Sequence, residues 1–290
     1  MKTLKKIILI IFTITLSTLI LMPSEVHQTG LVFAKTNSSV IEQKENSSTK
    51  QAPMLAIVID DFGGYDRSGV KTMLSIPIPL TCAIMPNLDY TTEDMENAVK
   101  SSKEVILHMP MQSHVNLPAD WYGPVYIYNT DTPAEATAKL DSCLSNVHQA
   151  KGFNIHIGSG VSQNRTLMKA ILSYAKEHGL YFLDSRTHVN TIGDVVAKEN
   201  NYVYMGRDEF LEPDHNKSYA NVKSHLLKAA QTAKEKGYAI AIGHVGAHGG
   251  ENTANAIKDT FKEIRESGVE LVYLSDIYKK LNGTTVSTEH

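Results

Sequence analysis

Short apolar, β-branched runs alternate with longer amphipathic segments from Met54 to about Leu281, and this alternation constrains the fold more than any other feature. A parallel strand is buried on both faces and reads as a continuous apolar run, whereas the crossover to the next strand reads as an amphipathic helix. The sequence therefore predicts an α/β fold. Eight runs qualify as strands: Leu55–Asp60, Leu80–Met85, Glu104–His108, Asn154–Ile157, Tyr181–Leu183, Val203–Met205, Ala239–Ile242 and Leu271–Leu274.

The helix signals are of two kinds. Thr132-Pro133-Ala134-Glu135 has the pattern of a capping box with proline at the first helical position, so a helix is expected from there to about Gln149. The other helices are expected to end just before a glycine, which supplies the left-handed residue that closes a helix. These segments are Arg165–His178, Ser218–Lys236 and Thr253–Ser267.

Two architectures satisfy this order of elements: a deformed seven- or eight-stranded β/α barrel and an open doubly wound sheet. Polar residues stand at the C-terminal ends of many different strands rather than at one switch point, which favours the barrel. No GxGxxG pattern follows the first strand, so nucleotide binding has little support.

The N-terminal segment, residues 1–34, has the pattern of an export signal. Lys2, Lys5 and Lys6 precede an uncharged stretch from Ile7 to Met22, and Val32-Phe33-Ala34 offers small residues spaced as in a cleavage site. The segment is interpreted as a cleaved signal peptide, with an uncleaved membrane anchor as the alternative. Either interpretation predicts an extracytoplasmic protein, secreted or anchored to the outer face of the cell membrane.

The remaining sequence divides into three parts. Residues 35–52 are rich in Ser, Asn, Lys and Glu without apolar periodicity, which predicts a disordered linker. Residues 53–281 form the expected catalytic domain, and the polar residues 282–290 are expected to be a flexible tail. Residues 35–290 carry 25 Lys and Arg against 30 Asp and Glu, without a cluster of basic residues, so nucleic-acid binding is not expected.

Asp60 and Asp61 directly follow the first apolar run. Neighbouring residues of an extended chain point to opposite sides, so the two carboxylates can do different work in one site. A plain strand-ending turn would need only one aspartate, and two crowded carboxylates repel each other unless a cation or an arginine is present. The pair is therefore interpreted as functional.

Histidines end further strands of the predicted sheet. His108 precedes Met109-Pro110, His156 precedes a Gly158 turn, and His244 is flanked by Gly243 and Gly246. One carboxylate, Asp61, and two imidazoles, His108 and His156, form a ligand set that binds Zn²⁺ with positions left open for water and substrate.

These residues stand in segments that resemble the divergent polysaccharide deacetylases, a branch of the NodB-type carbohydrate esterases. The resemblance covers roughly Leu55 to Leu281 and implies a deformed β/α barrel, a divalent transition metal and removal of acetyl groups from an amino-sugar polymer. The segments are IVIDDFG (57–63), LHMPM (107–111), NIHIGS (154–159), FLDSRT (182–187), RDEFL (207–211) and AIGHV (241–245).

The resemblance also implies roles for single residues. Asp60 matches the catalytic base, His244 the catalytic acid, and Asp184 the residue that orients that acid. Asp61, His108 and His156 match the metal ligands. On chemical grounds alone, Arg186 is a candidate to pair with Asp60 and keep it ionised, with Arg207 as an equal candidate. One departure stands out: typical family members place both metal histidines in one HxxxH stretch, whereas here the second comes from another strand.

The function predicted from these residues is an exported, metal-dependent deacetylase that removes acetyl groups from a cell-envelope or extracellular polysaccharide, with N-acetyl groups as the expected substrate and O-acetyl groups as the alternative. Two alternatives remain: a catalytically inactive relative that binds glycans, and another metal-dependent barrel hydrolase such as a phosphoesterase or a glycosidase. A glycosidase needs two carboxylates about 5–10 Å apart across the sugar, for which adjacent aspartates are poorly placed. Trp121, Tyr122, Tyr126 and Tyr128 follow the third strand, in a loop where aromatic rings can stack on sugars or simply anchor the loop.

Overall fold

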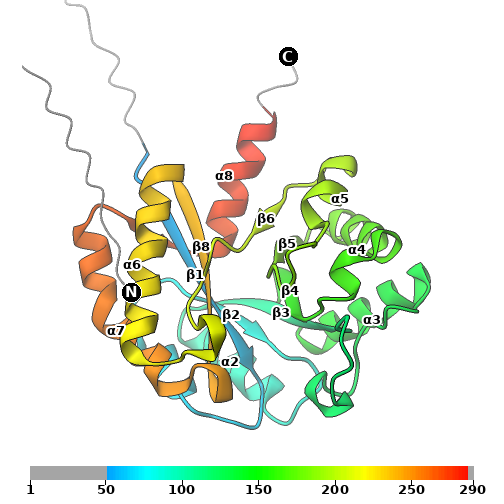
Figure 1. The fold of residues 1–290 in the computed structure, drawn as a ribbon, viewed down its shortest axis with the longest axis horizontal. Helices are drawn as coiled ribbons and strands as arrows, with labels where there is room; N and C mark the ends of the chain where they lie inside the picture. Colours follow the sequence, from blue (N-terminus) through cyan, green and yellow to red (C-terminus); the bar gives the residue numbers. More distant parts are fainter. Residues whose placement is uncertain (1–50, 287–290) are drawn as a thin grey trace, which may run out of the picture. The chain divides into compact units, whose positions relative to one another are not determined.

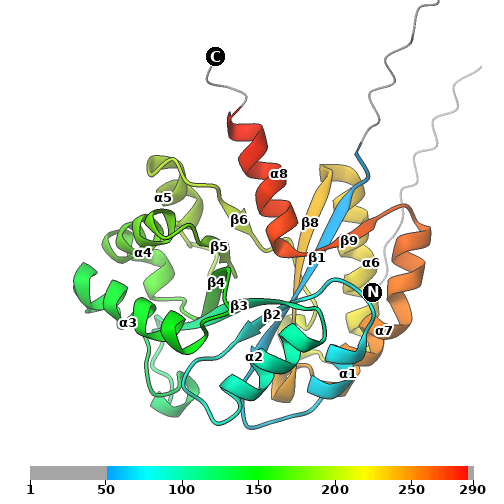
Figure 2. The same ribbon diagram turned by 180° about the vertical axis from the view of Figure 1, so that it is seen from behind.

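A computed structural model of the chain describes residues 51–286 and contains one parallel sheet surrounded by helices (Figures 1 and 2). The predicted signal or anchor, residues 1–34, and residues 35–50 of the predicted linker lie outside the described residues, as do residues 287–290. The strands are β1 (Met54–Phe62), β2 (Thr81–Ile84), β3 (Glu104–Met111), β4 (Gly152–Ile157), β5 (Tyr181–Asp184), β6 (Met205–Gly206), β7 (Glu209–Phe210), β8 (Tyr238–His244) and β9 (Glu270–Val272).

The strand order identifies the architecture. It runs β6-β5-β4-β3-β2-β1-β8-β7 without the reversal that defines a doubly wound sheet, and β9 pairs with the start of β1. Strand β6 pairs with β5 while β7 pairs with β8, and only Arg207 and Asp208 separate them in sequence. The chain thus passes within two residues from one edge strand of the sheet, β6, to the other edge strand, β7. The sheet is therefore curved round on itself, and the deformed β/α barrel is confirmed.

The helices lie around the sheet, with α6 and α7 beside β8 and β1, and α3 and α4 on the far side (Figure 1). Their bounds are α1 (Val70–Ser75), α2 (Thr91–Lys100), α3 (Pro133–Asn146), α4 (Arg165–Glu177), α5 (Gly193–Glu199), α6 (Tyr219–Lys236), α7 (Gly250–Glu266) and α8 (Leu274–Val286). The predicted capping box is present at α3, where Thr132 and Glu135 bond each other's backbone N–H groups. Across residues 51–286, none of the helices has the length and apolar character that crossing a membrane requires.

Two buried apolar clusters divide the strand residues by their period of two. On β1, Leu55, Ile57 and Ile59 pack toward the helices, whereas Met54, Ala56 and Val58 belong to the inner cluster. The inner cluster also contains residues of the other strands and of α8, which lies between β8 and β6 (Figure 2). This apolar cluster fills the barrel on the side where β1 begins. Only inward-facing residues nearer the C-terminal ends of the strands are therefore free to line a site.

The structure differs from the predicted elements in several places. Helix α8 runs from Leu274 to Val286, so Leu274 begins a helix rather than ending a strand, and residues 282–286 of the predicted tail belong to this helix. The two-residue strand β7 was not predicted, because two residues cannot show a period. Strand β6 begins at Met205, at the end of the predicted run 203–205.

Candidate active site and metal centre

The inward-facing series of side chains ends in a cavity of about 490 Å³ at the C-terminal ends of the strands. The inner positions of β1 lead from Val58 to Asp60, and those of β3 lead from Ile106 to His108. On each strand, the residue two positions after the last inward-facing core residue therefore points into the cavity. Six of the seven predicted site residues line it: Asp60, Asp61, His108, His156, Arg186 and His244.

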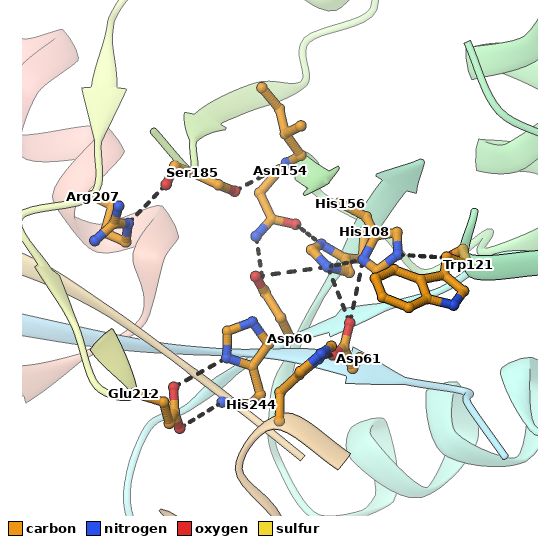
Figure 3. Close-up of polar contacts among 12 residues, drawn as sticks. Asp60, Asp61, His108, Trp121, Asn154, His156, Ser185, Arg207, Glu212 and His244 are labelled. Carbon is orange, nitrogen blue, oxygen red and sulfur yellow. Dashed lines mark hydrogen bonds and ion pairs between the residues drawn. The ribbon is translucent and has the colours of Figure 1, made fainter. Parts of the chain in front are cut away.

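Asp61 reaches the cavity by a break in the strand. Regular alternation would turn its side chain away from Asp60, but its φ is 69° and the register between β1 and β2 shifts between Ile59 and Phe62. A bulge of this kind redirects a side chain at the end of a strand. Both carboxylates therefore line one cavity, with Asp61 turned toward His108 and His156 and Asp60 between His108 and His244 (Figure 3).

Asp61, His108 and His156 come together as one cluster of possible metal ligands. Asp61 Oδ1 lies 3.4 Å from His108 Nε2 and 3.3 Å from His156 Nδ1, and the two ring nitrogens are 3.1 Å apart. Ligand atoms about 2.0–2.1 Å from a tetrahedral ion are separated by roughly 3.3 Å. The spacing of these three atoms is therefore that of three ligands of a tetrahedral ion.

The partners of the two imidazoles determine which nitrogen carries the proton (Figure 3). His108 Nδ1 lies 2.7 Å from Asn154 Oδ1, and His156 Nε2 lies 3.0 Å from the Trp121 carbonyl oxygen. Both oxygens only accept hydrogen bonds, so each of these nitrogens donates. In the neutral rings, His108 Nε2 and His156 Nδ1 then carry lone pairs and face Asp61.

The donor set fits a divalent transition metal. Two lone-pair nitrogens and a carboxylate oxygen within about 3.4 Å repel one another unless a positive charge lies between them. Burial disfavours the charged form of Asp61, but its polar contacts with His108, His156 and His248 outweigh this effect and hold the pKa of this carboxyl well below its ordinary value. Uncharged oxygens behind ligating histidines are typical outer partners of metal sites.

Asp60 is enclosed beside this cluster and is only 2% exposed. Asn154 Nδ2 donates to its Oδ1 at 2.8 Å, while its Oδ2 is 3.7 Å from His108 Nε2. Burial raises the pKa of Asp60 against the opposing charges of His108 and His244. A carboxyl with a raised pKa can accept a proton near neutral pH more readily than an exposed one.

His244 ends β8, where it is the register partner of Asp60, and lines the cavity on the other side of β1 from His108 and His156; we call this side the opposite wall. Its Nδ1 is 3.1 Å from Glu212 Oε2, and its backbone N–H donates to Glu212 Oε1 at 3.2 Å. Thr253 also donates to Glu212, which is 2% exposed. Burial favours the neutral ring, but Glu212 and the Asp61 and Asp60 carboxylates outweigh it and raise the pKa of His244 to about 9.

The expectation that Asp184 orients His244 was wrong, and Glu212 holds that position. On β5, Tyr181 and Leu183 face the inner cluster, so the alternation turns Asp184 outward. There it accepts hydrogen bonds from the Arg186 N–H, from Thr191 and from Tyr204. Glu212 escaped prediction because it follows a strand of only two residues.

The expected pairing of Arg186 or Arg207 with Asp60 is also absent. Arg186 donates to the Tyr204 hydroxyl and to the Arg207 carbonyl, and Arg207 donates to the carbonyls of Ser185 and Arg186. Asp60 is held by Asn154 instead. Both guanidinium groups nevertheless line the cavity.

Three further residues of the site carried little or no signal in the sequence. Asn154 bridges Asp60 and His108 from within β4, and Trp121 acts through its backbone carbonyl, for which any residue type would serve. His248, one of several loop histidines without a distinguishing pattern, lies 3.0 Å from Asp61 Oδ2 through its Nδ1. That contact leaves Asp61 Oδ1 to face His108 and His156.

The sequence profile of the divergent polysaccharide deacetylase family matches residues 57–278. An uncharacterized protein of Escherichia coli K12 is 31% identical over 202 residues, which are 68% of this chain and 60% of that protein. The chain thus spans less than two thirds of this relative.

Two solved structures share the fold. An uncharacterized protein from Agrobacterium tumefaciens superposes with a TM-score of 0.67 at 17% identity, over 78% of this chain and 89% of that one. The catalytic domain of a peptidoglycan N-acetylglucosamine deacetylase from Eubacterium rectale gives a TM-score of 0.51 at 13% identity, over 77% and 89% of the two chains. At these identities the likeness concerns the fold alone.

Proposed function

Because this chain belongs to the divergent polysaccharide deacetylase family, we propose that it hydrolyses acetyl groups, mainly N-acetyl groups, of a cell-envelope or extracellular polysaccharide with the help of a divalent transition metal, Zn²⁺ in the first instance. The observation that carries the proposal is the convergence of Asp61 Oδ1, His108 Nε2 and His156 Nδ1 at 3.1–3.4 Å beside two groups suited to moving protons.

Asp61, His108 and His156 would hold the metal, which when bound supplies Lewis acidity that activates water and polarises the acetyl carbonyl. Asp60 then accepts the proton of the attacking water, since its burial raises the pKa and Asn154 fixes its orientation. The two adjacent aspartates thereby divide the work of binding and proton transfer.

The second half of the reaction expels an amine, which leaves poorly unless it is protonated. His244 donates this proton from the opposite wall, because Glu212 stabilises its imidazolium form. Glu212 touches His244 and not the reacting atoms, so it acts as a positioning residue. Thr253 keeps the Glu212 carboxylate in place.

We also propose that the protein works outside the cytoplasm. The basic and apolar pattern of residues 1–34 supports this location, either through a cleaved signal or through an N-terminal anchor. Fractionation of cells that produce the full chain, followed by determination of the mature N-terminus, distinguishes a secreted form from an anchored one. A protein retained in the cytoplasm with an intact N-terminus would contradict the proposal.

The experiment that tests the proposed function combines metal analysis with acetate release from N-acetylglucosamine polymers and from O-acetylated xylan. We expect about one metal ion per chain, acetate release from an N-acetylated polymer, and loss of both after chelation. Metal occupancy without acetate release would instead support an inactive glycan-binding relative. Release of phosphate or of reducing ends from other substrates would identify a different hydrolase.

A further inference from the structure

Two arginines stand where the cavity of the proposed active site continues into a second hollow. Arg186 and Arg207 line both the site cavity and a neighbouring hollow of about 610 Å³. Figure 3 shows Arg207 on the opposite side of Asp60 from Trp121, next to Ser185. A polymer that presents one sugar to Asp60 and extends into the second hollow therefore passes both guanidinium groups.

Contacts on several sides hold the Arg186 side chain. Its Nε donates to the Tyr204 hydroxyl at 3.2 Å and its Nη1 to the Arg207 carbonyl at 2.9 Å. The guanidinium also lies against Gly206, where an added Cβ would approach its Nε to 2.6 Å. A larger residue at position 206 would displace the guanidinium, so Gly206 allows Arg186 to lie where these contacts hold it.

Arg207, which directly follows Gly206, is held in a similar way. Its Nε donates to the Ser185 carbonyl at 2.7 Å, its Nη2 to the Arg186 carbonyl at 3.0 Å, and its guanidinium lies 4.8 Å from the centre of the Phe210 ring. Each arginine thus spends two of the five N–H donors of a guanidinium, and the others stay available to a ligand.

Among residues 51–286, neither guanidinium forms a direct ion pair with a carboxylate. In the part of the chain that the structure describes, the ion pairs made by arginines belong to Arg67 and Arg165. Two acidic residues of this region bond to other partners: Asp184 to Thr191 and Tyr204, and Asp208 to Lys236. Burial and the neighbouring charge of Arg186 lower the pKa of Arg207, and the more distant carboxylates of Glu209, Asp60 and Asp184 offset this only in part.

We propose that Arg186 and Arg207 bind a negatively charged substituent, a carboxylate or a phosphate group, on the sugar next to the one that is deacetylated. The guanidinium fork matches both groups through paired, charge-assisted hydrogen bonds. Asp60 and Asp61 repel an anion in the site cavity, and Asp194 repels one in the second hollow, which it also lines. The anion is therefore confined to the arginines. This inference rests on the proposed function and specifies its substrate as an acidic polysaccharide.

The test measures binding rather than turnover. Isothermal titration calorimetry of the full chain uses three probes: trigalacturonate, inorganic phosphate and the neutral trimer of N-acetylglucosamine. Arg186→Gln and Arg207→Gln should weaken the binding of an anionic probe on the order of 10- to 100-fold, the range for hydrogen bonds to charged groups. Binding of the neutral trimer should be unchanged. Arg165→Gln is the matched control, because Arg165 is exposed and pairs with Glu199 outside the cavity.

The two anionic probes distinguish the source of the charge. A loss confined to trigalacturonate assigns the site to a sugar carboxylate, a loss confined to phosphate assigns it to a phosphate group, and a loss of both supports the shared chemistry. Equal affinities in the parent chain and both variants, or an equal loss for the neutral trimer, would overturn the inference. If Arg207→Gln does not fold, Arg186→Gln and Arg186→Lys decide, and the lysine variant should recover part of the affinity by keeping the charge.

This measurement is independent of the deacetylase proposal. Absence of acetate release from every polymer would refute that proposal while leaving the calorimetric comparison readable. If acetate is released, the arginine variants should raise KM for an acidic polymer and leave kcat, because their interactions hold the neighbouring sugar before and during the reaction.

Discussion

The two walls of the cavity use the same side chain, histidine, for opposite purposes, and the partner behind each ring makes the difference. On one wall, uncharged oxygens of Asn154 and Trp121 accept from His108 and His156, which directs the other nitrogen of each ring at Asp61. On the other wall, the carboxylate of Glu212 faces His244 and stabilises its imidazolium form. In this cavity the two rings with neutral acceptors behind them are the candidate metal ligands, and the ring with a carboxylate behind it is the candidate proton donor.

This contrast predicts that the largest loss of activity follows damage to the metal wall. Asp61→Asn removes the only carboxylate of the cluster and should abolish metal binding at micromolar zinc. Activity should then fall by more than the roughly 10²–10⁴-fold that general acid–base groups supply, because nucleophile and carbonyl activation are lost together. Acetate release and elemental analysis measure both effects. Asp66→Asn, a change in the same loop at an exposed carboxylate, is the control.

The second largest effect is expected on the opposite wall and should depend on the leaving group. His244→Ala should lower activity on an N-acetylated sugar by about 10²–10⁴-fold, while an activated aryl acetate, which leaves as an anion, should be affected far less. Zinc content should not change. Equal losses on both substrates, or loss of zinc, would show that His244 shapes or binds the metal site. His178→Ala, on the exposed end of α4, is the control.

A smaller effect should follow from changing the neutral partner behind a ligand. Asn154→Leu keeps the approximate shape but removes the bonds to His108 and Asp60. Loss of such an outer partner typically lowers metal affinity by about 10–100-fold. Zinc titration against a competing chelator measures the change, and the melting temperature of the metal-free variant reports whether the fold persists. Unchanged affinity would mean that Asn154 does not determine which ring nitrogen of His108 carries the proton.

The smallest effect on rate is expected for Glu212→Gln, which replaces the charged partner of His244 by a neutral one of similar shape. The pKa of His244 should fall from about 9 toward its ordinary value of 6.5. The alkaline limb of the pH–rate profile should then move to lower pH.

The same substitution has a defined effect on stability. In the metal-free parent chain the raised pKa of His244 stabilises the fold below pH 6.5, and this contribution is lost as the pH rises through about 9. It amounts to at most about 3 kcal/mol, the difference between 6.5 and about 9 at 1.36 kcal/mol per unit. Urea unfolding at both ends of this range should show a smaller pH difference in the variant. An identical difference would exclude Glu212 as the cause.

Some residues of the two walls could be placed from the strand pattern in the sequence, and others could not. Asp60, His108 and His244 each end a long apolar run, so the period of two places them at the cavity once the barrel is assumed. Asp61 required a bulge and a left-handed φ that no pattern in the sequence announces. The metal wall was nevertheless recognisable, because its ligand types are specific.

The partners behind the rings were beyond sequence reasoning. Glu212 follows a strand of two residues, Asn154 lies inside a strand, and Trp121 contributes only a carbonyl. Asp184 seemed the better partner of His244 because it ends a predicted strand, but strand alternation turns it away from the cavity. Residues at strand ends are thus predictable, whereas the second layer that decides their chemistry depends on tertiary contacts.

The central claim is that His108 and His156 hold a metal while His244, in the same cavity, does not. Elemental analysis of the parent chain, His108→Ala, His156→Ala and His244→Ala after equilibration with equimolar zinc tests it directly. The account predicts about one zinc per chain in the parent and in His244→Ala, and strongly reduced zinc in the other two variants. Undiminished zinc in His108→Ala and His156→Ala, or its loss in His244→Ala, would contradict the assignment of the two walls.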